Sequence, residues 1–279
     1  MNYAKKLAAR MREYGQVCVG IDPHQNLLER WGLENSAKGA LEFGLRTVEA
    51  AAENSAAVKP QSALFECYGS AGIAALEKIL QAARDAGLVS ILDVKRGDIG
   101  STMAAYARAY LAKGAPLEAD AITVSPYLGF GSLRPAVDLA IENGKGLYVL
   151  GLTSNPEGPE VQQATTANGY SVAKYVVEHA AEVNNSACGN SHMGPIGIVA
   201  GATIGDVLKK LNINLSNAKV SILSPGFGAQ GAGKQELASV FKGVQENVLA
   251  SASRSILMNG PDKADLVKAI QSFRTQLFE

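Results

Sequence analysis

The sequence predicts an α/β protein, specifically a single-domain (β/α)8 barrel of the TIM type. Eight short apolar runs recur along the 279 residues, and they alternate with helical patterns. The runs are continuously apolar, which is typical of parallel strands that are buried on both faces. No linker or low-complexity tract divides the chain, so we predict one domain over residues 1–279. A doubly wound open sheet is the alternative arrangement.

The strands and helices follow from the position of the apolar runs. The strands are predicted at residues 17–21, 56–58, 88–92, 121–124, 147–150, 196–200, 220–223 and 248–252. The clearest helices between and after them are predicted at residues 41–52, 73–86, 170–183 and 264–277. A further helix should follow the third strand, with Asp98 or Ser101 as its cap.

The first residues, 1–14, are expected to form a short amphipathic helix. Basic and apolar residues are mixed there, and no apolar stretch is long enough for a signal peptide or a membrane span. Hydrophobic residues make up 47% of the chain and charged residues 19%, so a large core is expected and extensive disorder is not. The formal net charge is zero, which argues against binding to nucleic acid or to a membrane surface. The three cysteines are scattered, as in a reduced, cytoplasmic protein.

Polar side chains gather at the predicted carboxyl ends of the strands, where a TIM barrel has its active site. They are Asp22, Lys59, Asp93, Lys95, Ser154 and Arg254. Asp93 and Lys95 are two residues apart, so on an extended chain they should point to the same side. Opposite charges packed together at a strand end hold each other ionised, and such clusters are candidates for functional sites. The competing interpretation of this stretch is a surface ion pair followed by a helix cap.

The loops after the last two strands have the composition of a phosphate site. Residues 224–233 are rich in glycine, and Ser253-Arg254-Ser255 follows the eighth strand. Glycines let backbone N–H groups approach an anion, while Gln230 and Arg254 add side-chain donors. A flexible turn is one alternative. A P-loop is another, because residues 228–234 fit G-x-x-x-x-G-K, but Gln235 stands where magnesium binding requires Ser or Thr.

Other catalytic arrangements find no support in the sequence. The three histidines have no metal-ligand spacing, so no metal site is predicted. No G-x-S-x-G elbow, Ser-His-Asp triad or dinucleotide-binding G-x-G-x-x-G is evident. A lysine flanked by carboxylates and facing a phosphate-binding rim suits proton transfer at carbon on a phosphorylated substrate, without a redox cofactor.

Residues 93–99, Asp-Val-Lys-Arg-Gly-Asp-Ile, resemble the D-x-K-x-x-D-I motif of the orotidine 5'-phosphate decarboxylases. Sugar-phosphate enzymes of the same suprafamily share part of this motif. The resemblance to the longer bacterial branch, type 2, rests on an ordered set of further segments: residues 20–24 with 31–33, 59–61, 153–156, 225–231 and 254–256.

The resemblance implies a reaction and a role for each motif residue. The family converts orotidine 5'-phosphate to UMP and CO2, the last step of de novo UMP synthesis, without a metal or organic cofactor. By resemblance, Asp22 and Lys59 hold the ribose hydroxyls, with Lys59 also bonded to Asp93. Asp93 lies against the substrate carboxylate, and Lys95 protonates C6 of the pyrimidine.

The remaining roles concern the rim of the site and a partner subunit. The resemblance implies a homodimer in which Asp98 and Thr102 reach into the partner's site. Ser154 is expected to read the pyrimidine edge, and Gln230 and Arg254 to hold the phosphate. Pro225 and Ser253 complete the expected substrate-binding set. The loops 153–158 and 224–233 are candidate lids.

Two alternatives to a decarboxylase remain open on the sequence. One is a 3-hexulose-6-phosphate synthase or a related sugar-phosphate lyase, which shares the core motif but requires magnesium. The other is a barrel that keeps the phosphate site as a ligand sensor. The complete Asp93, Lys95 and Asp98 set argues against a sensor, because a sensor needs no proton donor.

Overall fold

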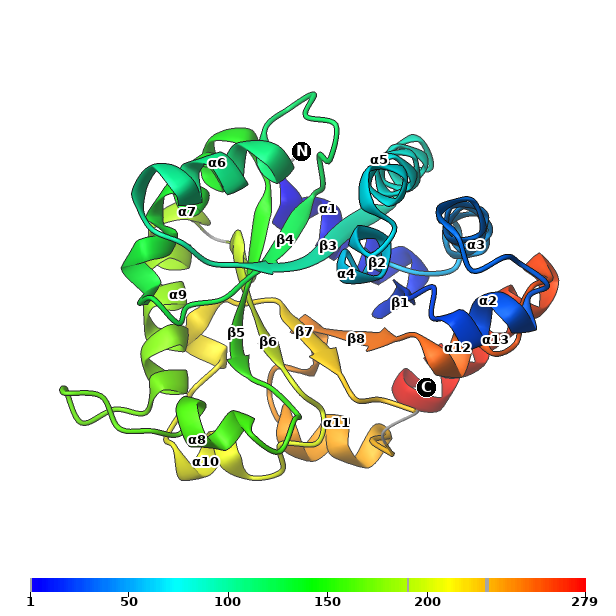
Figure 1. The fold of residues 1–279 in the computed structure, drawn as a ribbon. Helices are drawn as coiled ribbons and strands as arrows, with labels where there is room; N and C mark the ends of the chain where they lie inside the picture. The colour runs from blue at the N-terminus through cyan, green and yellow to red at the C-terminus, as the bar shows by residue number, and fades with distance from the viewer. Residues whose placement is uncertain (1, 190, 229–230) are drawn as a thin grey trace.

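The computed structural model describes residues 2–189, 191–228 and 231–279, and its strands form a closed parallel barrel surrounded by helices (Figure 1). The strands pair in sequence order, and pairing of the first with the last closes the barrel. They are β1 Val17–Ile21, β2 Ala57–Pro60, β3 Val89–Arg96, β4 Ala121–Val124, β5 Gly146–Leu152, β6 Ile196–Ala200, β7 Ile222–Pro225 and β8 Val248–Ala252. The predicted (β/α)8 barrel is confirmed, and the open-sheet alternative is wrong.

Apart from the first, the helices pack around the outside of the barrel, where apolar faces of strands and helices share one core. In chain order they are α1 Tyr3–Tyr14, α2 Gln25–Arg30, α3 Ala37–Ala51, α4 Ala63–Glu66, α5 Gly69–Asp85, α6 Gly100–Leu111, α7 Arg134–Asn143, α8 Gly158–Gln162, α9 Val172–Ala187, α10 Val207–Lys210, α11 Lys234–Val240, α12 Arg254–Leu257 and α13 Lys263–Phe278. Short 3-10 turns occur at η1 Phe130–Leu133, η2 Ser216–Ala218 and η3 Gln245–Asn247. Among the described residues, no helix is long and apolar enough to cross a membrane.

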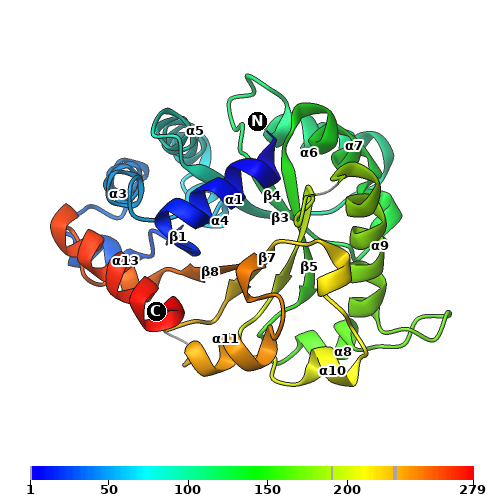
Figure 2. The ribbon, with the colours of Figure 1, turned by 180° about the vertical axis from the view of Figure 1, so that it is seen from behind.

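Helix α1 lies across the amino-terminal end of the barrel, as the view from behind shows (Figure 2). Its apolar residues Tyr3, Leu7 and Met11 join the cluster of side chains that fills the barrel interior. The Tyr3 hydroxyl donates a hydrogen bond of 2.7 Å to the buried hydroxyl of Tyr148 on β5. The barrel interior is therefore closed at this end by the side chains of α1.

Two local expectations are corrected by the structure. The predicted cap of α6 is wrong, because neither Asp98 nor Ser101 caps it: the N-cap position is Ile99, which has no side-chain cap. The Asp98 carboxylate instead accepts the N–H of Ile99, the very next residue, at 2.8 Å. Strand β3 also runs four residues further than predicted, to Arg96, because pairing with β4 resumes at Arg96 after a shift of register.

Candidate functional site

The centre of the site is a carboxylate held between two ammonium groups at the end of the barrel. Lys59 Nζ lies 2.8 Å from Asp93 Oδ2, and Lys95 Nζ lies 2.5 Å from Asp93 Oδ1. The side chains of Lys59 and Asp93 are 11% and 9% exposed, whereas that of Lys95 is 46% exposed. Lys59 therefore forms the floor of the site, and Lys95 is the more accessible of the two ammonium groups.

Electrostatics keep this group of side chains ionised. Burial by itself raises the pKa of Asp93, but the positive charges of Lys59 and Lys95 outweigh it and lower that pKa to about 2. For Lys59, burial lowers the pKa, and the negative charges of Asp93 and Asp22 raise it above its ordinary value. The pair therefore remains charged throughout the physiological pH range.

The backbone at Lys95 is not extended. Its φ is +44°, in the left-handed region that non-glycine residues rarely adopt, and the β3–β4 register shifts between Leu92 and Arg96. Asp93 and Lys95 do come together, but the predicted reason, two residues on one side of a regular strand, is wrong. The cause is a bulge that only the pairing of β3 with β4 creates.

Thr123 on β4 lies opposite this bulge in β3, and the sequence interpretation missed it. Its Oγ1 accepts the backbone N–H groups of Val94, at 3.0 Å, and Lys95, at 2.9 Å. The same hydroxyl donates to Asp93 Oδ1 at 2.8 Å. Gln61, with its amide nitrogen facing the carboxylate, donates to Asp93 Oδ2 at 2.9 Å. The only sequence signal for Thr123 was one hydroxyl in an otherwise apolar run.

Two adjoining cavities open at this end of the barrel and share Lys59, Pro225 and Ser251. The first, of about 260 Å³, contains Asp93, Lys95, Thr123 and Ser154 among its lining residues. The second, of about 430 Å³, is lined on its outer side by Asp22, His24, Phe227, Ser253 and Arg254. The structure thus brings together eight of the predicted residues: Asp22, Lys59, Asp93, Lys95, Ser154, Pro225, Ser253 and Arg254.

Two residues of the second cavity carry buried polar atoms that no described residue pairs with. Asp22 Oδ1 and Ser253 Oγ are buried and have no hydrogen bond within the described part of the chain. Gly20 on β1 allows these two side chains to approach, because a Cβ there would lie 2.8 Å from Ser253 Cβ and 3.4 Å from Asp22 Oδ2. Buried polar groups are normally hydrogen-bonded, so the Asp22 oxygen is suited to a ligand hydroxyl that donates, and the Ser253 hydroxyl is suited to a ligand hydroxyl or an anionic oxygen.

Two predicted residues, Asp98 and Thr102, do not line these two cavities, and a third predicted residue is not described by the structure. Asp98 is partly exposed and Thr102 is exposed, and neither lines either cavity of this chain. Gln230 lies outside the described residues, so the structure does not place it. The described ends of its loop do converge, since Phe227 and Ala232 form a bridge.

The loop after β5 is held by hydrogen bonds to α8. Gln162 of α8 donates to Thr153 Oγ1 at 2.6 Å and accepts the backbone N–H of Thr153 at 2.9 Å. Thr153 in turn donates to Asn155 Oδ1 at 2.6 Å. Asn155 and Ser154 both line the first cavity. The hydrogen bonds of Thr153 therefore fix the position of the loop residues that line it.

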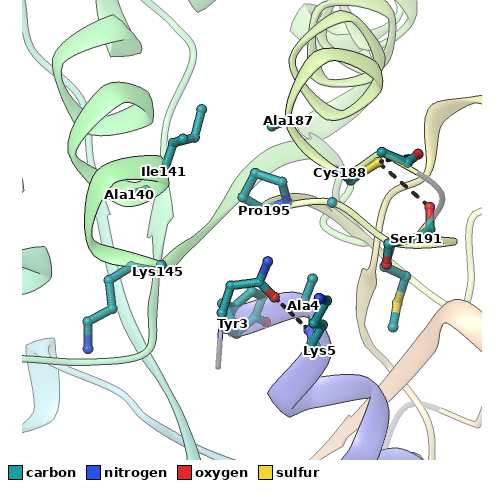
Figure 3. Close-up of a pocket in the computed structure, with 15 residues that line it drawn as sticks. Tyr3, Ala4, Lys5, Ala140, Ile141, Lys145, Ala187, Cys188, Ser191 and Pro195 are labelled. Atoms are coloured by element: carbon teal, nitrogen blue, oxygen red, sulfur yellow. Dashed lines mark hydrogen bonds between the residues drawn. The ribbon is translucent and has the colours of Figure 1, made fainter.

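A separate pocket of about 300 Å³ lies at the opposite end, between α1 and the ends of α7 and α9 (Figure 3). Tyr3, Lys5, Cys188 and Pro195 are among its lining residues, and none of the predicted site residues reaches it. It is therefore distinct from the candidate site. Across the residues that the structure describes, no three His, Cys, Asp or Glu side chains are grouped to hold a metal ion.

Comparison with known proteins points to one family. The family model described as "Orotidine 5'-phosphate decarboxylase / HUMPS family" matches residues 15–270. The orotidine 5'-phosphate decarboxylase of Streptomyces coelicolor is 48% identical over 275 residues, which cover 99% of this chain and 96% of that protein.

Solved structures agree with the sequence comparison. A crystal structure from Streptomyces avermitilis, assigned provisionally as an orotidine 5'-phosphate decarboxylase, matches with a TM-score of 0.92 and 48% identity, covering 98% of this chain and 94% of that one. The OMP decarboxylase of Leishmania donovani matches with a TM-score of 0.76 and 30% identity, over 99% of each chain.

Proposed function

The chain belongs to the orotidine 5'-phosphate decarboxylase family, and on that basis we propose that it converts orotidine 5'-phosphate to UMP and CO2. Membership confirms the resemblance inferred from the motif and the expected class of enzyme, a carboxy-lyase of pyrimidine nucleotide synthesis. The observation that carries the detailed mechanism is the Lys59–Asp93–Lys95 group, which combines an accessible ammonium with a buried, ionised carboxylate.

Lys95 is the proposed proton donor. When the bond between C6 and the substrate carboxylate breaks, CO2 leaves and the bonding electron pair remains on C6. The Lys95 ammonium, on a side chain that is 46% exposed and lines the first cavity, stabilises this charge and transfers a proton to C6 to form the C–H bond of UMP. The neutral amine then regains a proton from solvent. Lys59 is less suited, because its side chain is 11% exposed and is held by Asp93.

Asp93 is proposed to lie against the substrate carboxylate. Its pKa of about 2 keeps it negatively charged, so two carboxylates would be adjacent in the bound state. Departure of CO2 removes that repulsion, while the attraction of the two ammonium groups for the developing charge remains. Because positive charge at the reacting carbon comes from lysine, we propose that the reaction needs neither a metal nor an organic cofactor.

The second cavity is proposed to bind the ribose and the phosphate. Asp22 Oδ1, buried without a partner among the described residues, suits a ribose hydroxyl donor, and Lys59 serves the neighbouring hydroxyl. Arg254 and Ser253 at the outer rim, together with Gln230, are proposed to hold the phosphate. Ser154, which lines the first cavity, would bind the edge of the pyrimidine. Pro225 lies between the first and the second cavity and lines both.

We propose a homodimer that completes each site. Apolar side chains are exposed on the loops after β3 and β4, which are joined by a bond from Ser125 N–H to the Arg96 carbonyl: Ile99 is 63% exposed, Tyr127 80% and Leu128 52%. A second copy packed on this surface would bury them and bring Asp98 and Thr102 to the partner's cavity. A cytoplasmic location is proposed on the basis of the three free cysteines.

Mixed dimers test the shared site. Lys95→Ala and Asp98→Asn chains are each expected to be inactive alone. When they are co-refolded, half of the dimers are mixed and each mixed dimer has one intact site, so activity should return to about a quarter of the parent value. No recovery on mixing would contradict a site that is shared between chains.

The reaction itself is tested by following the absorbance of orotidine 5'-phosphate with and without EDTA. Loss of substrate absorbance that EDTA does not affect is the expected result. Turnover that EDTA abolishes and magnesium restores would contradict the cofactor-free mechanism. Tight binding of UMP without turnover would leave the nucleotide site in place but would refute decarboxylation, as a sibling lyase or a sensor would predict.

A further inference from the structure

We propose that Thr123 is a positioning residue, whose hydroxyl holds the bulge at Val94–Lys95 and thereby sets the Lys95 ammonium against Asp93. Thr123 lies on β4, while the groups it holds lie on β3. The effect on reaction rate rests on the proposed function, but the effect on the backbone does not.

The Thr123 hydroxyl is used to its full hydrogen-bonding capacity. A hydroxyl has one proton to donate and two lone pairs to accept with. Both acceptor positions are taken by consecutive backbone N–H groups, those of Val94 at 3.0 Å and Lys95 at 2.9 Å. The proton goes to Asp93 Oδ1 at 2.8 Å, and the ionised carboxylate can only accept, so the direction of all three bonds is fixed.

The place of these bonds explains why a side chain is needed. The register of β3 against β4 shifts between Leu92 and Arg96, and both amides lie inside that shift. Thr123 is fully buried, so the hydroxyl acts as an acceptor where water is excluded. A β-branched side chain has few rotamers in a strand, which holds the oxygen in one position. The hydroxyl therefore stabilises a conformation, φ = +44° at Lys95, that lysine would otherwise avoid.

The consequence for chemistry is a defined position for the proton donor. Lys95 Nζ and Thr123 Oγ1 both contact the same carboxylate oxygen, Asp93 Oδ1, so the hydroxyl fixes both the backbone beneath the lysine and its ion-pair partner. Thr123 contacts neither Arg254 nor the outer cavity that is proposed to bind ribose and phosphate. Loss of the hydroxyl should therefore lower kcat and leave binding of the product UMP largely intact.

The test is a graded series at this position. Thr123→Ser keeps the hydroxyl, Thr123→Cys replaces it with a thiol that is a weaker donor and acceptor, and Thr123→Val removes it at nearly constant volume. We expect kcat within about 3-fold of the parent for Ser, reduced about 5- to 10-fold for Cys and about 10- to 100-fold for Val. The Kd for UMP should stay within about 3-fold in all three. If Thr123→Val does not fold, the comparison of Ser with Cys decides the question.

Thr47→Val is the matched control. Thr47 is also buried, and its hydroxyl donates to the carbonyl of Phe43 within α3, away from both cavities. The kcat of the Thr47→Val enzyme should equal that of the parent. A Thr123→Val enzyme with parental kcat would overturn the proposal, as would a Thr123→Ser enzyme as slow as Thr123→Val, since the methyl packing would then be the cause.

A crystal structure of Thr123→Val separates this inference from the proposed reaction. We expect the backbone at Lys95 to leave the left-handed region and Lys95 Nζ to move away from Asp93. An unchanged bulge and an unchanged Lys95–Asp93 contact would overturn the positioning role. If the parent chain does not decarboxylate orotidine 5'-phosphate, the proposed function fails, and this structural comparison still decides the role of Thr123.

Discussion

Replacing Lys95 with glycine should give a more stable protein than replacing it with alanine, which inverts the usual order. Both variants lose the ion pair with Asp93, so that loss cancels in the comparison. The backbone at Lys95 has φ = +44°, a conformation that costs a residue with a Cβ about 1–2 kcal/mol. Glycine avoids this cost but loses about 0.5–1 kcal/mol through the greater entropy of its unfolded chain. The net difference should favour glycine by about 0.5–1 kcal/mol.

Denaturant and thermal unfolding of the two variants measure this difference. For a chain of this size, about 1 kcal/mol corresponds to about 2 °C in Tm, so Lys95→Gly should melt about 1–2 °C above Lys95→Ala. Lys78, exposed in α5, provides the control, because glycine there should be less stable than alanine by about 1 kcal/mol. A glycine variant at position 95 that is destabilised as much as at position 78 would refute the argument from backbone strain. Neither Lys95 variant should turn over substrate, although both should still bind UMP.

Three further predictions concern binding, pH and stability. Arg254→Ala, at an exposed rim position, should lower kcat/KM about 100-fold with no change in Tm, and an unchanged kcat/KM would count against a phosphate role. The pKa of Asp93 is lowered from 3.8 to about 2, so its contribution of about 2 kcal/mol is present above pH 4 and is lost as pH falls toward 2. In the Asp93→Asn variant the free energy of unfolding should therefore depend less on pH between pH 4 and pH 2. A pH dependence as steep as that of the parent would refute this. Asn184→Ala removes buried bonds to Ile196 and Lys219 and should cost about 2–3 kcal/mol in denaturant unfolding with kcat unchanged; a fall in kcat would contradict a purely structural role.

Local patterns were sufficient for most of the barrel. The strands predicted at 17–21, 121–124, 196–200 and 248–252 have those bounds in the structure, because each is a continuous apolar run between polar ends. The end of β3 was placed too early, since Asp93 and Lys95 interrupt the apolar pattern although they belong to the strand. The charge of Asp93 in this buried strand is stabilised by partners that local sequence does not reveal, among them Lys59, which is 34 residues away in the sequence.

The sequence by itself determined where the strands and helices lie along the chain, and with it that Asp22, Lys59, Asp93 and Arg254 follow or end strands at their carboxyl ends. These properties depend on the periodicity of apolar residues and on which residue follows each strand, and both can be read locally. Only the tertiary structure decided how the site is held. The left-handed backbone at Lys95 and its bonds to Thr123 arise from the register between β3 and β4, and register depends on contacts between segments far apart in the chain.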